Sequence, residues 1–422
     1  MTLSVHAAGI IGLVVIFIVG TLRPINLGVL ALGMTFAVGV FVAHETPAEM
    51  YRGFPVDLFI LLTGVTYLFA IAERNGTLAR IVEGAVRLTR GRRHLIPWAV
   101  FVIAAAPAMA GAIGSAGVAL LAPISMRLAE RCGIDRRLIG LMVVHGAAAG
   151  NFSPLNVLGA IVLQAVTSRG VQLSAWDLFV GNVAYNLVLG VIIVFVFGRR
   201  ARTAQGDGTG ADRHDASAIA STPADWQFEH VCTVLALAAV AVIALGFGLS
   251  IGFVALAVGA LLQLAFSRTT TGAERQIAWP VVLLVCGIVT YVAALQRYGT
   301  VDAVGHQILG MGTPLIVALL LCAVGAVTSA FASSAGILGA LIPLAAPLML
   351  QGRVGTTGLI VALAVSATVV DATPFSTVGA LVVANASETE RPVVYRGLLA
   401  WGAVMVVTAP LVTWLVFILP GW

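Results

Sequence analysis

The chain has 422 residues, of which 60% are hydrophobic and only 10% are charged, and its formal net charge is +5 at pH 7. A soluble domain cannot bury this much apolar side chain, so the composition excludes a soluble enzyme and leaves no room for a globular domain outside the membrane. All 23 basic residues are arginines. Because most of them flank apolar runs, they indicate membrane topology and not nucleic-acid binding.

Apolar runs as long as a bilayer-spanning helix recur along nearly the whole chain. We therefore predict an all-α polytopic membrane protein with about ten transmembrane helices. The predicted spans cover residues 8–20, 27–43, 56–72, 138–168, 178–198, 230–247, 250–266, 277–296, 355–387 and 397–418.

Two further segments, 95–127 and 313–350, are long enough to enter and leave the membrane on one side. Small residues interrupt each at its middle, as "GAIGSAG" at 111–117 and "SAFASSAG" at 329–336. We predict two re-entrant helical hairpins. An amphipathic arm at 77–90 precedes the first hairpin, and a weaker one at 300–310 precedes the second.

Two stretches 223 residues apart resemble each other. "GVTYLFAIAERNGT" (64–77) and "GIVTYVAALQRYGT" (287–300) share five identities in fourteen positions. They predict a first repeat at 1–198 (the first half), a cytoplasmic linker at 199–228 that is rich in Gly, Ala and charge, and a second repeat at 229–422 (the second half).

The arginines set the orientation of these repeats. If the arginine-rich arm at 74–93 is cytoplasmic, 19 of the 23 arginines lie inside and both termini lie outside. The two halves then cross the membrane in opposite directions. Inverted-topology repeats of this kind are typical of secondary transporters.

A second pair of related stretches, "NFSPLNVLGA" (151–160) and "DATPFSTVGA" (371–380), lies 220 residues apart inside two predicted spans. We interpret Ser153-Pro154 and Thr373-Pro374 as helix N-caps followed by proline at the first helical position. Each span would then stop and restart near the midplane. The restart presents backbone N–H groups to an anion, from Leu155, Asn156, Phe375 and Ser376, while the carbonyls that end each preceding half-helix suit a small cation.

Asp371 is costly at this depth, by about 2.5–3.5 kcal/mol, so it either caps a half-helix or binds a cation or proton. We predict a cation site from Asn151 and Asp371, with Na⁺ or H⁺ as the coupling ion and no other metal, cofactor or catalytic residue. The predicted substrate-binding residues are Ser115, Asn151, Ser153, Pro154, Asn156, Ser333, Ser334, Thr373, Pro374, Ser376 and Thr377. His145 is interpreted as locally packed or hydrogen-bonded.

The stretches "GFPVDLFILLTGVTYLFAIAERNGT" (53–77) and "GLMVVHGAAAGNFSPLNVLGAIV" (140–162) resemble the bacterial malonate or dicarboxylate carrier family. This family is a branch of the ion transporter superfamily, which also contains the divalent anion:sodium symporters. The resemblance implies an elevator-type, cation-coupled carrier of small dicarboxylates, dimeric and located in the bacterial inner membrane. The asparagines at the hairpin tips of the sodium symporters are missing here, where the tips read Ile113-Gly114-Ser115 and Ser333-Ser334-Ala335.

Two other functions fit parts of the pattern. The same scaffold serves ion or proton antiporters and oxyanion exporters. An intramembrane hydrolase would use Ser115 as its nucleophile and His145 as its base, although the second half has no matching histidine. A chain without lysine contains no phosphate-binding glycine motif followed by Lys, so nothing indicates ATP use.

Overall fold

The computed structural model describes residues 2–23, 25–78, 80, 81, 84, 94–112, 114–203, 226–301, 303, 313–330, 334–350, 352 and 354–421. Throughout these residues the structure is helical, without strands. Most of the predicted arms and of the linker lie outside the described residues, as do Ile113 and Ser333.

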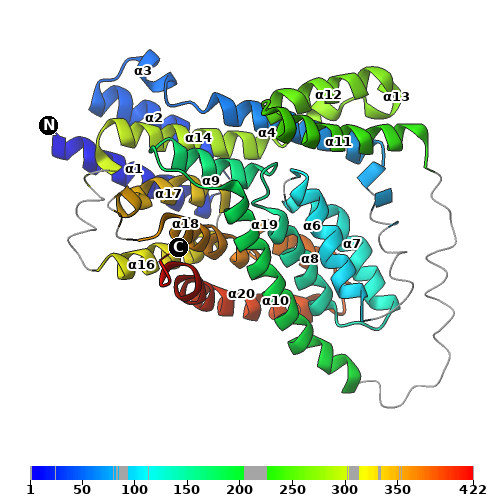
Figure 1. Cartoon of the computed structure of the whole chain (residues 1–422). Coiled ribbons are helices and arrows are strands. Elements are labelled where there is room, and N and C mark those ends of the chain that lie inside the picture. The colour runs from blue at the N-terminus through cyan, green and yellow to red at the C-terminus, as the bar shows by residue number, and fades with distance from the viewer. Residues whose placement is uncertain are drawn as a thin grey trace, which may run out of the picture.

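The first of two packed bodies forms the upper layer in Figure 1. Its buried side chains share one hydrophobic core, and we call it the upper body. Its elements are α1 (Thr2–Leu22), α2 (Leu27–Val38) with a π-helical turn (Gly39–Ala43), α3 (Pro47–Tyr51), α4 (Val56–Arg74), α11 (Phe228–Phe247), α12 (Ile251–Ala265), α13 (Ser267–Thr270), a 3₁₀ turn (Ala273–Gln276) and α14 (Trp279–Arg297).

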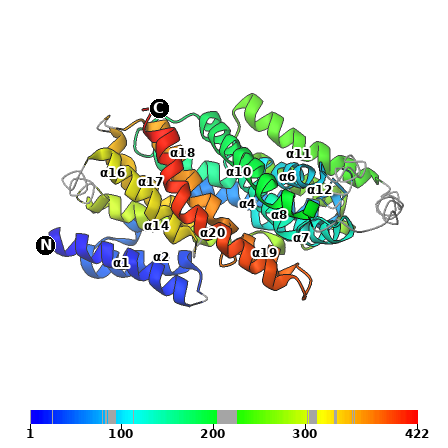
Figure 2. The same cartoon turned by 90° about the horizontal axis from the view of Figure 1, so that it is seen from below.

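The second body, which we call the lower body, has a separate hydrophobic core. It contains both hairpins, which lie on opposite sides of α20 (Figure 2). Its elements are α6 (Ile96–Met109), α7 (Gly114–Arg131), α8 (Arg136–Gly150), α9 (Val157–Thr167), α10 (Ala175–Thr203), α16 (Pro314–Ser329), α17 (Ser334–Leu350), α18 (Thr356–Thr368), the 3₁₀ turn η4 (Val369–Ala372), α19 (Thr377–Ala384) and α20 (Arg391–Thr413) with a π-helical turn (Trp414–Ile418).

Each predicted span coincides with helix, and each predicted hairpin is a helix pair with a turn at its middle. Five helical segments are long and apolar enough to cross a membrane: Val56–Arg74, Ala175–Gly198, Ser267–Arg297, Thr356–Ala384 and Arg391–Ile418. The other apolar helices of the described residues are shorter. The chain is thus a multi-pass membrane protein, and the prediction of two broken spans, at 138–168 and 355–387, is confirmed.

Two matched glycine contacts join the halves inside the upper body. α2 packs against α14, and α12 packs against α4. A Cβ on Gly287 would lie 2.1 Å from the carbonyl oxygen of Gly28, and one on Gly64 would lie 2.2 Å from that of Gly252. Only glycine permits backbones this close. Helices at equivalent positions therefore make the same contact twice, each with a partner from the other half.

Candidate functional site

Both helix breaks begin with a β-turn that has proline at its second position. The N–H of Asn156 donates to the carbonyl of Ser153 at 2.9 Å, and the N–H of Ser376 donates to that of Thr373 at 3.1 Å. Proline presets this turn position. The prediction that Ser153 and Thr373 are N-caps is therefore wrong, because the Ser-Pro and Thr-Pro pairs build the turn before the helix.

The true N-caps lie three residues later. The side-chain oxygen of Asn156 accepts from the N–H of Leu158 at 2.8 Å, and that of Ser376 accepts from the N–H of Gly379 at 3.0 Å. The backbone N–H groups of Asn156 and Ser376 are used within the turns, so they are not the free donors that the sequence predicted. The donors without an intrahelical acceptor lie in the first turns of α9 and α19, which start at Val157 and Thr377.

The hydroxyls of Ser153 and Thr373 donate hydrogen bonds to the hairpin turns. Ser153 Oγ donates to the carbonyl of Met109 at 2.5 Å, and Thr373 Oγ1 donates to that of Ala330 at 3.0 Å. Both acceptors lie at the turn of a hairpin. Asn156 Nδ2 adds bonds of 2.7 and 3.1 Å to carbonyls on both sides of the first hairpin turn, those of Ala108 and Ala112. Each break is thus fastened to the hairpin of its own half.

A cavity of about 300 Å³, the binding cavity, lies between the hairpin tips, the two breaks and the start of α14. It brings together seven of the predicted residues: Ser115, Asn151, Asn156, Ser334, Asp371, Ser376 and Thr377. Four others, Ser153, Pro154, Thr373 and Pro374, do not line it. None of the described residues that line the cavity is basic.

On the second-half side of the cavity, the hydroxyl of Ser334 contacts the Asp371 carboxylate. Ser334 Oγ lies 2.8 and 2.7 Å from its two oxygens, and Ser329 Oγ donates to Ser334 Oγ at 2.9 Å. The carbonyl oxygen of Asp371 accepts from Ser376 Oγ. Because Ser376 caps α19, the capping role predicted as one option for Asp371 is not observed.

On the first-half side, Asn151 occupies the position equivalent to Asp371. Its side chain is buried, with a relative exposure of 6%, and its Oδ1 has no hydrogen-bond partner among the described residues. Gly114 lies beside this oxygen and supplies no hydroxyl: a Cβ built on it would be 3.2 Å from Asn151 Oδ1. A buried acceptor without a donor is costly, which points to a ligand at this place.

His145 lies outside the binding cavity and is fully buried. Its Nδ1 bonds Asn186 Oδ1 at 3.1 Å, and its Nε2 accepts from Trp401 Nε1 at 2.9 Å. The prediction of local hydrogen bonding is confirmed. Since both ring nitrogens are engaged, His145 cannot serve as the base for Ser115, and the hydrolase interpretation lacks its proton acceptor.

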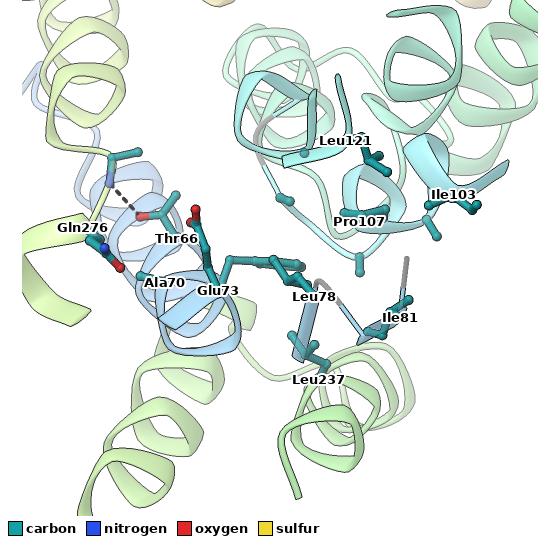
Figure 3. Close-up of a pocket in the computed structure, with 16 residues that line it drawn as sticks. Thr66, Ala70, Glu73, Leu78, Ile81, Ile103, Pro107, Leu121, Leu237 and Gln276 are labelled. Atoms are coloured by element: carbon teal, nitrogen blue, oxygen red, sulfur yellow. Dashed lines mark hydrogen bonds between the residues drawn. The ribbon is translucent and has the colours of Figure 1, made fainter. Parts of the chain in front are cut away.

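A second pocket, of about 160 Å³, lies between α4, α11 and the first hairpin (Figure 3). Apolar side chains line most of it, including Phe69, Leu121 and Leu237, and Glu73 is the one acidic residue among the described residues that line it. It contains none of the predicted site residues. A mostly apolar wall offers few hydrogen-bond donors to a carboxylate, so we do not assign the substrate to this side pocket.

Sequence reasoning missed two groups near the site. Pro280 and Val281, at the start of α14, line the cavity from the upper body, and only the proline near the beginning of that span pointed to them. Asn182 and Asn186 are buried next to the first break. The sequence could have predicted them, because two asparagines four residues apart lie on one face of a membrane helix, where their amides need hydrogen-bond partners.

A polar cavity between two hairpin tips and two helix breaks, inside an apolar all-helical protein, defines a membrane transporter. Comparison with known families agrees with this class. Residues 3–151 match the family model of the dicarboxylate carrier protein MatC N-terminus, and residues 240–421 match that of the citrate transporter. The resemblance to carriers of this type, inferred from the sequence, is thereby confirmed, and the chain is a transporter and not an enzyme.

Among solved structures, the chain is similar to the YdaH transporter of Alcanivorax borkumensis, which was described as having an unusual topology. The TM-score is 0.62 at 14% sequence identity, and the match covers 89% of this chain and 88% of that one. At this identity the likeness shows the fold alone. Comparison with curated protein sequences gave no match.

Proposed function

We propose that the protein is a cation-coupled secondary carrier of small dicarboxylates, with malonate as the first candidate. It would act by an elevator-type motion as a homodimer in a bacterial inner membrane, with both termini outside. The observation that carries the proposal is the binding cavity, whose polar groups come from both halves and, among the described residues, include an acid but no base. The two matched families, named for dicarboxylate and citrate carriers, support a carboxylate substrate.

The cavity has donors for a carboxylate. Hydroxyls of Ser115 and Thr377 line it, and the first turns of α9 and α19 begin at its wall. Helix N-termini attract anions through their free N–H groups and their dipole. These are the groups that we assign to the substrate.

A dianion beside Asp371 also needs positive charge in the same cavity. No arginine in the described part of the chain supplies it there, and an uncompensated charge away from water is very costly. Asn151 Oδ1 is a buried acceptor without a donor, and a carboxylate has no hydrogen to give it. We therefore assign Asn151 and Asp371 to a co-bound cation, Na⁺ or H⁺.

The elevator motion is supported by the two hydrophobic cores, although Val157 and Ile161 of α9 and Ala335 and Ala340 of α17 pack into the core of the upper body. Hairpins and helix breaks belong to the lower body, while α14 reaches the cavity from the upper body. A rigid movement of the lower body would carry the bound substrate past α14.

Ligand-induced thermal stabilisation of the purified protein tests the site. A ligand present at 100 times its Kd stabilises by about 2.7 kcal/mol, so malonate or succinate with Na⁺ should raise the Tm, while acetate should not. Thr377→Trp fills the binding cavity and should abolish the shift. Leu237→Trp fills the side pocket instead, and as the matched control it should keep the shift. A folded wild-type protein that responds to no carboxylate would contradict the proposal.

A further inference from the structure

The last carbonyl groups of α8 are already occupied. The end of a helix presents carbonyl oxygens without intrahelical donors, at the negative end of the helix dipole, and this is where a cation binds in a broken membrane helix. Here Asn182 Nδ2 donates to the carbonyls of Ala148 and Ala149, at 2.8 and 3.0 Å. The next carbonyl, that of Gly150, accepts from the N–H of Ser153 at 3.2 Å.

A chain of hydrogen bonds fixes the direction in which Asn182 points. The indole of Trp401 can only donate, so His145 Nε2 accepts and His145 Nδ1 donates to Asn186 Oδ1. Asn186 Nδ2 then donates to Asn182 Oδ1 at 3.0 Å. This leaves the Asn182 amide nitrogen facing the carbonyls. The four side chains that form these hydrogen bonds are all buried, so solvent offers them no alternative partner.

The second half cannot repeat this arrangement. The residue 220 positions after Asn182, the offset that relates Asn151 to Asp371, is Gly402. A Cβ on Gly402 would lie 2.3 Å from Thr373 Cγ2, so the second break leaves no room for a side chain there. In place of an amide donor, this half has the carboxylate of Asp371.

From this difference we infer that the amide of Asn182 fills the cation place of the first half, and that the carrier binds a single coupling cation, a monovalent metal ion. The inference rests on the proposed carrier function and adds the number of coupling cations that each subunit binds. The Asp371 carboxylate supplies the charge for the ion, and Asn151, whose Oδ1 has no hydrogen-bond partner among the described residues, lines the same cavity. α8 packs against the 3₁₀ turn that contains Asp371, which brings the two breaks together at one cavity.

The test measures initial malonate uptake by proteoliposomes as a function of Na⁺ concentration, together with equilibrium binding of ²²Na⁺ to the purified protein. The wild type should give a Hill coefficient of about 1 and one Na⁺ per subunit. In Asn182→Ala the carbonyl of Ala149 loses its side-chain donor, while that of Ala148 keeps the N–H of Asn151 at 3.1 Å. This variant should bind a second Na⁺, and its Hill coefficient should rise toward 2.

Asn385→Ala is the matched control, because Asn385 Nδ2 donates to the helix carbonyl of Leu381 at 2.8 Å, away from both breaks. It should behave as the wild type does. A wild-type count of two Na⁺, or uptake that is independent of Na⁺, overturns the inference and leaves the carrier intact. Folded protein without any uptake contradicts the carrier function itself. The wild-type count decides the matter even if Asn182→Ala does not fold.

Discussion

At the first helix break the hydroxyl of Ser153 holds the carbonyl of Met109, and at the second the hydroxyl of Thr373 holds that of Ala330. Each break continues with the same proline turn and then with a capped helix. The polar side chains at the two breaks nevertheless differ. An amide stands at position 151 and a carboxylate at position 371.

The difference between Asn151 and Asp371 shows that the backbone geometry of a repeat and the charge of its side chains can vary independently. The backbone and its hydroxyl contacts are duplicated because both halves have to shape one cavity. The groups that carry charge are not duplicated, since the first side uses neutral amides and the second uses Asp371 with Ser334. Equivalent positions therefore give the same geometry without giving the same ligand.

The largest expected effect comes from removing the charge that distinguishes the two sides. Asp371→Asn makes them alike in charge, and because the cation loses its carboxylate, kcat/KM should fall about 100-fold, equal to about 2.7 kcal/mol. Uptake rates at varied Na⁺ and varied pH measure this. Asp177→Asn, at the exposed start of α10, is the control. An unchanged dependence on both ions would remove Asp371 from the cation site.

A smaller effect, a loss of unfolding free energy, should be about equal for the two contacts between a helix break and its hairpin. Thr373→Val and Ser153→Ala each leave a hairpin carbonyl without its donor, which costs about 1–3 kcal/mol. Thermal unfolding of both variants should show similar losses of stability. If one loss is large and the other negligible, the two contacts are not equivalent.

The smallest effect concerns the caps. Replacing an N-cap by alanine costs about 1 kcal/mol, and Ser376→Ala should show this loss. Asn156→Ala should lose about 1 kcal/mol more, because Asn156 Nδ2 also bonds the carbonyls of Ala108 and Ala112. Equal losses of unfolding free energy in the two variants would contradict the extra role of Asn156.

Much of the fold followed from the sequence because apolar length and small-residue interruptions are local signals. The apolar helical segments, both helix pairs and both helix breaks were predicted at their observed positions. The N-caps were placed three residues too early, since Ser-Pro is equally a turn signature and only the observed bond from Asn156 to Ser153 distinguishes the two.

The candidate site was predicted less completely, because some of its contacts join distant segments. The cavity-lining residues near the breaks and the tips were found by their repeat positions. The contact from Asn182 to the end of α8 spans more than thirty residues and depends on how α10 packs. Pro280 and Val281 belong to the other body, and a proline near the start of a span was too weak a signal to place them in the cavity.

The most direct test of the central claim is uptake of radiolabelled malonate into proteoliposomes under a Na⁺ gradient, under a proton gradient and under neither, with succinate and malate as competitors. The account predicts that malonate accumulates when the Na⁺ gradient is present, and that the competitors reduce this uptake. Absence of uptake under every gradient, by protein shown to be folded, would contradict it and favour an ion antiporter or an oxyanion exporter on the same fold.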